Sequence, residues 1–165
     1  MKLIEIRQKE IDRVEVIIQE VMEIIGYHIK SSIYLPLMMN LLQEEKIKNS
    51  SNNTIILLKL ISYMILTTED LEDHVNDLLY IVKNYEKILI DNDEGLVTVE
   101  KIAITLINRL QHYNYDSFIK TVFSILLNVQ ATRSLPKEEI EASHRAMENL
   151  AKKAGYVTVA ELHSQ

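Results

Sequence analysis

Apolar residues recur every seven positions at the start of the chain, and this repeat constrains the fold more than any other feature of the sequence. The repeat runs through Ile4, Ile11, Ile18 and Ile25, with Val14, Val21 and His28 between them at steps of three and four. Such spacing places side chains on one face of an α-helix, whereas a half-buried strand alternates at every second residue. We therefore expect a helix over about residues 2–29.

The apolar face of this first helix is wider than the seam of a two-stranded coiled coil. Ile17, Met22 and Ile24 flank the repeat, and charged residues occupy the opposite face of the helix. A stripe of this width is typical of a helix packed into a bundle. Any part of the stripe that one core does not cover would be available for a symmetric dimer.

Helical patterns continue to the end of the chain. We expect further helices at about 36–46, 54–66, 67–90, 98–112, 116–129 and 136–154, with a last short turn at 158–161. Pro36 in a first turn, Thr98 as an N-cap and Gly155 as a C-cap support these limits. The sequence therefore predicts an all-α fold, a compact bundle of seven to eight helices. The helices at 54–66 and 116–129 carry the most apolar residues, so we expect them at its buried centre.

The composition fits one globular domain that spans residues 1–165. The chain has 165 residues, 47% of them apolar, with 24 acidic residues, 18 basic residues and a net charge of −6. This length allows a single hydrophobic core. The segment 136–165 is richer in Ala, Glu and Lys than the rest, and we expect it to form either an outer helix or an arm that reaches a partner subunit.

Several classes of protein are disfavoured by composition. The chain has no cysteine, which excludes disulfides, thiol nucleophiles and cysteine-based metal sites. The acidic balance argues against binding to nucleic acid, which needs clustered Lys and Arg. The most apolar window, 55–66, is too short to cross a membrane and contains Lys59. We therefore expect a cytoplasmic protein that contacts neither nucleic acid nor membrane.

Three histidines offer a candidate metal site. Helical bundles bind metal ions through His and Glu from facing helices, and His28, His74 and His112 would form such a site if the ends of their helices met. His28 and His112 fall near expected helix C-termini, where the helix dipole also favours histidine. The alternative for His74 is a solvated face, because it lies in an acidic stretch. No motif in the sequence requires a cofactor.

The segment 91–101 resembles an EF-hand calcium-binding loop. Asp91, Asp93 and Glu94 precede a glycine between two expected helices, and that family places acidic ligands before a glycine. The segment is one residue short, and Lys101 stands where the loop needs a closing carboxylate. The resemblance implies a weak calcium site at these three acidic residues, and the alternative is an acidic surface turn.

Two further features are candidates for a partner surface. The segment 69–77 has five carboxylates and no Lys or Arg: Glu69, Asp70, Glu72, Asp73 and Asp77. It is either a solvated helix start or a patch that meets a basic partner. Tyr113 and Tyr115 stand in a tight turn between two expected helices, and tyrosine is enriched in the cores of protein interfaces.

The sequence contains no phosphate loop, no nucleophile elbow, no HExxH and no dinucleotide fingerprint. It therefore favours a non-enzymatic protein that binds a protein partner or itself, such as a regulator, an inhibitor or an immunity-type protein acting on a basic partner. Two alternatives stay open. One is a metal-binding bundle with hydrolase activity that uses the histidines. The other is a small-ligand-binding domain with a pocket between the helices at 54–66, 67–90 and 116–129.

Overall fold

The computed structural model of the chain describes residues 2–89, 91–110, 116–131, 135–156 and 158–164. The elements are α1 (Lys2–His28), α2 (Ser31–Ile47), α3 (Ser51–Met64), the 3-10 helix η1 (Leu71–His74), α4 (Val75–Ile88), α5 (Asp93–Arg109), α6 (Asp116–Ala131), α7 (Lys137–Lys153) and α8 (Val159–His163). These residues form helices and turns and no strand, so the predicted all-α fold of seven to eight helices is confirmed. None of the helices described is both long and apolar enough to cross a membrane.

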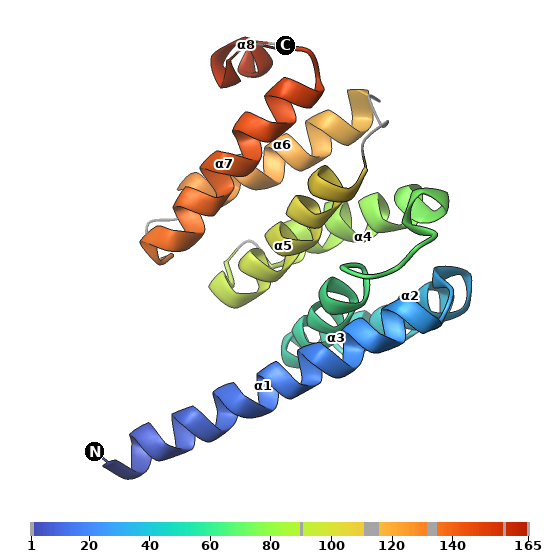
Figure 1. Ribbon diagram of the computed structural model, residues 1–165, viewed down its shortest axis with the longest axis vertical. Coiled ribbons are helices and arrows are strands. Elements are labelled where there is room, and N and C mark those ends of the chain that lie inside the picture. Colours follow the sequence, from blue (N-terminus) through green and yellow to red (C-terminus); the bar gives the residue numbers. More distant parts are fainter. Residues whose placement is uncertain (1, 90, 111–115, 132–134, 157, 165) are drawn as a thin grey trace.

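The helices stack in layers (Figure 1). The first layer contains α1, α2 and α3, the second contains α4 and α5, and the third contains α6 and α7, with α8 packed on α7 at the far end. Short connections join consecutive helices, so neighbours in the sequence are mostly neighbours in space. The two chain ends therefore lie at opposite ends of the stack (Figure 1).

One continuous apolar core runs through the layers, and α5 lies at its centre. Helix α5 packs against α3, α4, α6 and α7. The sequence predicted α3 and α6 as the buried centre, and both do bury apolar side chains, but α5 is enclosed on more sides. The prediction missed α5 because that helix also buries polar residues, among them Glu100 and Thr105. Hydrophobicity alone does not reveal this arrangement.

The C-terminal segment joins the core. Helix α7 packs against α5 and α6 and buries Ala146, Met147 and Leu150. Its C-terminal end is marked by Gly155, whose φ of 87° suits the predicted C-cap. Thr158 then accepts the Glu161 N–H at 3.2 Å, which caps α8 as the sequence predicted.

Helix α2 begins five residues before the predicted start. Ser31 is its first residue, so Pro36 lies inside the helix rather than in its first turn. At this position the proline lacks the N–H that would bond to the carbonyl of Ser32, and its ring crowds that carbonyl, so it destabilises the second turn of the helix. The Ser31 N–H donates to Oδ1 of Asp70 at 3.1 Å. A carboxylate 39 residues away therefore caps the start of α2, and no local pattern predicts such a contact.

The single helix predicted over 67–90 is interrupted. The chain turns after α3, forms the short η1, and starts α4 only at Val75. The Thr68 hydroxyl donates to the carbonyl of Met64 at 2.8 Å, and the Thr67 N–H donates to the same carbonyl at 3.3 Å, so α3 ends there and does not lead directly into a new helix. Threonine competes with the backbone in this way at helix ends and turns.

Helix α5 begins earlier than predicted, at Asp93 rather than residue 98. The Asn92 side chain is the N-cap and accepts the Gly95 N–H at 2.9 Å. Thr98, the predicted N-cap, lies within the helix and donates its hydroxyl to the Glu94 carbonyl. Asp93 and Glu94, two of the acidic residues that suggested a loop, are therefore first-turn residues, where the helix dipole favours negative charge.

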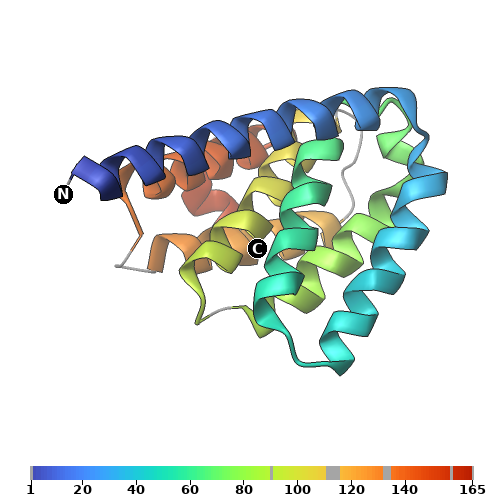
Figure 2. The same cartoon turned by 90° about the horizontal axis from the view of Figure 1, so that it is seen from below.

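Helix α1 extends far beyond the layer it belongs to (Figures 1 and 2). Every residue from 2 to 18 is exposed, and Gly26 is the only buried residue of the helix. The prediction that this helix packs into the bundle is wrong for its N-terminal half. The reason is length: α1 packs on α3, and its 27 residues span about 40 Å, whereas the 14 residues of α3 span about 21 Å.

Candidate functional site: the exposed face of helix α1

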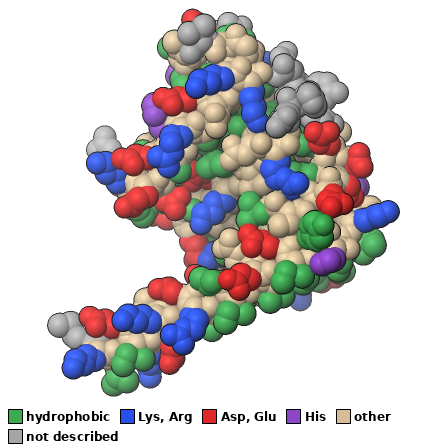
Figure 3. Space-filling view, in the orientation of Figure 1, with side chains coloured by type: hydrophobic (Ala, Val, Ile, Leu, Met, Phe, Trp, Pro, Cys, Tyr) green, Lys and Arg blue, Asp and Glu red, His purple; other side chains and the backbone are tan. Residues whose placement is uncertain are grey.

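Nine apolar residues line one face of α1, and we name this surface the α1 stripe. They are Leu3, Ile4, Ile6, Ile11, Val14, Ile17, Ile18, Val21 and Ile24, each between 40% and 73% exposed. At 100° per residue they fall within about 160° of the helix circumference. Figure 3 shows apolar side chains along the edge of α1 that points away from the layers.

The α1 stripe is large for a surface that faces water. A half-exposed aliphatic side chain leaves roughly 50 Å² of apolar area in contact with solvent, so the nine residues leave about 450 Å². The largest apolar patch on a typical monomeric protein is of this order and is often functional. The stripe is therefore a candidate for binding another protein.

The C-terminal end of α1 is fixed to the turn that follows α3. Gly26 lies so close to Met64 that an added Cβ would come within 2.1 Å of the Met64 carbonyl oxygen. The Thr67 hydroxyl donates to the carbonyl of Glu23, which ties the same turn to α1. Met22 packs partly buried against the core. This close contact leaves the helix little freedom to swing about its base.

A lysine on α3 makes a second attachment, nearer the middle of α1. The ammonium of Lys59 pairs with Glu94 of α5 and lies 3.9 Å from Glu15 of α1. Burial alone would lower the pKa of Lys59, but these two carboxylates raise it above its usual value. The ammonium therefore stays charged at neutral pH and lies between carboxylates of two other helices, although ion pairs this exposed contribute little to stability. N-terminal to Glu15, α1 projects into solvent.

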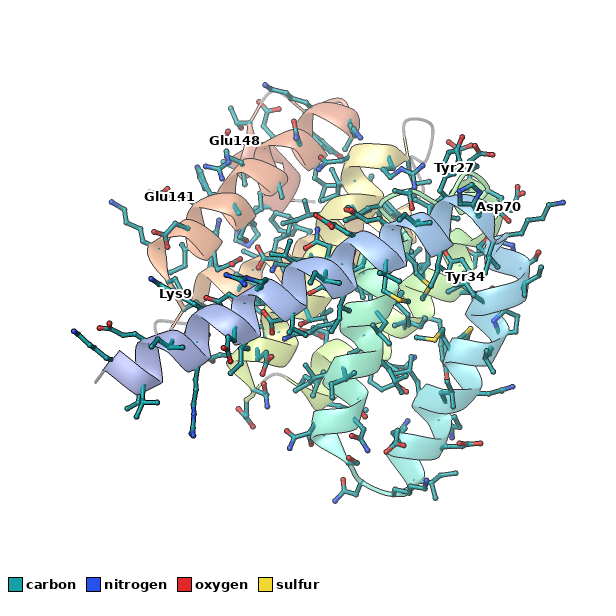
Figure 4. All side chains as sticks on the ribbon, turned by 60° about the horizontal axis from the view of Figure 1, so that its bottom comes forward. Lys9, Tyr27, Tyr34, Asp70, Glu141 and Glu148 are labelled. Carbon is teal, nitrogen blue, oxygen red and sulfur yellow. The ribbon has the colours of Figure 1, made fainter. Side chains whose placement is uncertain are left out.

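Hydrogen bonds also fix the corner where α1 leads into α2. The hydroxyl groups of Tyr34 and Thr68 bond to each other. Asp70 accepts the Ser31 N–H; burial alone would raise the pKa of Asp70, but its hydrogen bonds with Ser31 lower it. Figure 4 shows Tyr27, Tyr34 and Asp70 close together at this corner. Helix α1 therefore leaves the body of the protein in a defined direction.

The structure describes two of the three histidines of the predicted metal site, and they belong to different elements. His28 ends α1 and is exposed, with its ring edge-on to Tyr27 at 5.0 Å between centroids. His74 lies in η1, 3.8 Å from a carboxylate oxygen of Asp70 and 3.6 Å from one of Asp77. His112 lies outside the described residues, so the three-histidine site stays a prediction. In the part of the chain that is described, no group of three His, Asp or Glu side chains could hold a metal ion.

The residues of the calcium-like segment serve the start of α5. Asp93 and Glu94 are in its first turn, and Glu94 pairs with Lys59. Asp91 is exposed, immediately before the capping residue Asn92. These placements give the acidic residues a structural role at a helix start.

The two acidic segments do not form one surface. They flank the two ends of α4, whose 14 residues separate them by about 20 Å. Glu69, Glu72 and Asp73 are exposed, whereas Asp70 and Asp77 lie beside His74. Tyr113 and Tyr115, the other candidates for partner binding, lie outside the described residues.

The space predicted for a ligand pocket is occupied by protein. Helix α5 fills it, and side chains around it such as Leu58, Val82 and Leu126 have no exposed surface. A cleft beside the α2–α3 turn, lined in part by Tyr85 and Leu89, has a volume of about 40 Å³. That volume holds a few water molecules rather than an organic ligand.

Glu100 on α5 is a buried carboxyl group that the sequence did not reveal. Its side chain is 0% exposed, and neither carboxyl oxygen has a hydrogen-bond partner among the residues that the structure describes. Burial raises its pKa to about 8, the carboxylate of Glu139 on α7 adds to the shift, and Lys101 opposes it. Glu100 is therefore mostly protonated at neutral pH. A buried carboxyl group with a raised pKa makes the stability of the protein depend on pH.

The fold and the exposed surface together define an all-α protein with a projecting amphipathic helix. No family model, curated protein or solved structure matches the chain. Its function is therefore inferred from its own residues.

Proposed function

We propose that this protein is a non-enzymatic interaction protein and that the α1 stripe is its binding surface. The observation that carries the proposal is the length of α1 that has no neighbour. Residues 2–18 are all exposed, yet apolar side chains line one face of this segment as in a helix that packs against a partner. A helix that lays its apolar face on a complementary surface is a recurring mode of protein recognition.

The energetics of α1 support a partner. Ten of its 27 residues are Ile or Val, which are weak helix formers. A helix without packing partners is marginal in water, because most helical stability in proteins comes from burial of an amphipathic face. Covering the stripe and an equal area of a partner removes about 900 Å² of apolar surface from water, which favours association. Only the part of this free energy that exceeds the loss of translational, rotational and side-chain freedom appears as affinity.

Such a protein acts by occupying the helix-binding surface of another protein chain, as a cytoplasmic regulator or inhibitor does. A second candidate surface is the corner around η1, which would meet a basic partner. Residues 60–82 contain no Lys or Arg, and Glu69 and Asp73 are exposed there. Opposite charge on a partner would increase the rate of association, and this effect would weaken with added salt.

Site-specific photo-crosslinking in cells tests the proposal. A photoreactive amino acid replaces Val14 on the α1 stripe, or Ile88 on α4 as a control of similar exposure, 53% against 50%. We expect a discrete crosslinked protein from position 14 and none from position 88. Equal crosslinking from the two positions would contradict the proposal.

A further inference from the structure

We infer that the occupant of the α1 stripe is α1 of a second copy of this chain, packed antiparallel. This inference rests on the proposed function and names its partner. On the stripe the seven-residue repeat consists of Ile4, Ile11 and Ile18, whereas Ile25 is partly buried against the core of its own chain. Successive turns of the stripe therefore present side chains of the same kind. Two such helices can pack through knobs-into-holes contacts between their stripes. A twofold pairing needs only one surface, because each copy presents the same patch to the other.

Charge along α1 sets the direction of the pairing. Residues 2–14 contain all four basic residues of the helix and three acidic ones, a net charge of +1. Residues 15–28 contain three acidic residues and no Lys or Arg, a net charge of −3 with histidine neutral. An antiparallel pair places each basic half against the acidic half of the other copy, whereas a parallel pair places like halves together.

The parallel arrangement carries a specific penalty. In a parallel coiled coil, the residue before each repeat isoleucine contacts the residue five positions later in the other helix, which is the g-to-e′ contact. Glu10 of each copy would then lie beside Glu15 of the other, twice in the dimer. Glu15 already contributes its carboxylate to Lys59. The antiparallel arrangement separates these glutamates.

The body of each copy leaves room for the other. Gly26 faces the turn after α3, and Val14, at the centre of the stripe, lies about 120° from Gly26 round the helix. The stripe therefore points away from the layers, as Figure 3 shows. In the antiparallel arrangement the two bodies lie at opposite ends of the paired helices.

The area that the two stripes bury is what a stable dimer needs. Two copies contribute about 900 Å² of apolar area. Specific interfaces are about 60% apolar, so this corresponds to about 1,500 Å² of total buried area. Stable and specific interfaces bury 1,200–2,000 Å².

Sedimentation equilibrium of the full chain tests the pairing. We expect a dimer at about 10 μM, and a monomer for the double variant Ile17→Glu/Ile24→Glu, with a dissociation constant at least 100-fold higher. The control is Ile56→Glu/Ile88→Glu, which adds the same charge at positions of similar exposure on α3 and α4 and leaves the dimer intact. A dimer in both variants would overturn the inference.

Distances between spin labels on α1, with the stripe left unaltered, test whether the two helices pair antiparallel or parallel. Because the chain has no cysteine, Lys2→Cys and Lys9→Cys each give a single label, on the same side of α1 and seven residues apart. In an antiparallel pair, the distance along the helix axis between the two labels of the dimer should be about 21 Å shorter for the label at position 9 than for the label at position 2. Each label is then seven residues, at 1.5 Å per residue, nearer the centre of the pair. An unchanged separation would show a parallel pair and overturn the inference.

The failure of the inference and that of the proposed function are distinguishable. If the wild-type protein is a monomer at 100 μM, the inference that a second copy occupies the stripe is wrong. If position 14 still crosslinks to a different protein, the stripe remains the binding surface and the proposed function stands. If position 14 crosslinks to nothing in cells, the proposed function fails as well.

Discussion

Burial of Glu100 predicts an unusual dependence of stability on pH. Its pKa is about 8 in the folded protein, whereas an exposed glutamate in the unfolded chain has its ordinary pKa of about 4.3. Between these two values the folded protein holds a proton that the unfolded chain has released. Stability therefore falls as pH rises through this window, and the contribution becomes constant above about pH 8.

The size of the effect follows from the same two pKa values. Each pH unit within the window changes the free energy of unfolding by at most about 1.4 kcal/mol for one proton. Between pH 5 and pH 8 the limit is about 4 kcal/mol, and we expect a loss of about 2–4 kcal/mol. That is a large part of the 5–15 kcal/mol by which a domain is typically stable.

Glu100→Gln isolates this contribution, because glutamine has nearly the same shape and does not titrate. Urea unfolding at pH 5, 6, 7 and 8 gives the free energy of unfolding of both proteins. The difference between wild type and variant should change by about 2–4 kcal/mol across the series. Glu139→Gln removes a nearby carboxylate and should move the upper limit of the window to lower pH, whereas Glu138→Gln, which is exposed, should not. Identical pH dependence in wild type and Glu100→Gln would refute the reasoning.

Two further substitutions test the contacts that direct α1 and α2. Gly26→Ala places a methyl group against the Met64 carbonyl, so we expect a loss of about 1–3 kcal/mol in thermal or urea unfolding, despite the better helix propensity of alanine; an unchanged or higher stability would contradict the close contact. Asp70→Ala removes the cap of α2 and should cost about 1 kcal/mol in urea unfolding, whereas Asp73→Ala, at an exposed position, should cost less than about 0.5 kcal/mol; equal losses would argue against the cap.

The sequence predicted α1 to within one residue, because a seven-residue repeat is a local property of the chain. The same repeat did not reveal what covers the helix. An apolar stripe has the same pattern whether its partner is a neighbouring helix or another molecule. From the width of the stripe, the sequence predicted that any uncovered part would be available for a symmetric dimer. The structure leaves every residue from 2 to 18 exposed, and the stripe continues to Ile24.

Features that depend on distant residues were beyond the sequence. The start of α2 is capped by Asp70, 39 residues away, so the nearby Pro36 was a misleading marker. Likewise Glu100 is followed by Lys101 in the sequence, a pair typical of a solvated helix face, yet α5 is enclosed by four other helices and Glu100 is buried. The predicted histidine site depends on how helix ends meet, which no local pattern specifies.

Amide hydrogen exchange of residues 2–14 in the protein alone tests most directly whether the α1 stripe is covered by a second copy of the chain. This segment has every residue exposed, and an unpartnered helix of such composition exchanges within seconds because it unfolds readily. At 50 μM we predict that these amides exchange at least 100-fold more slowly in the wild type than in Ile17→Glu/Ile24→Glu, while α5 is equally protected in both. Equal and rapid exchange of residues 2–14 in the two proteins would contradict the account.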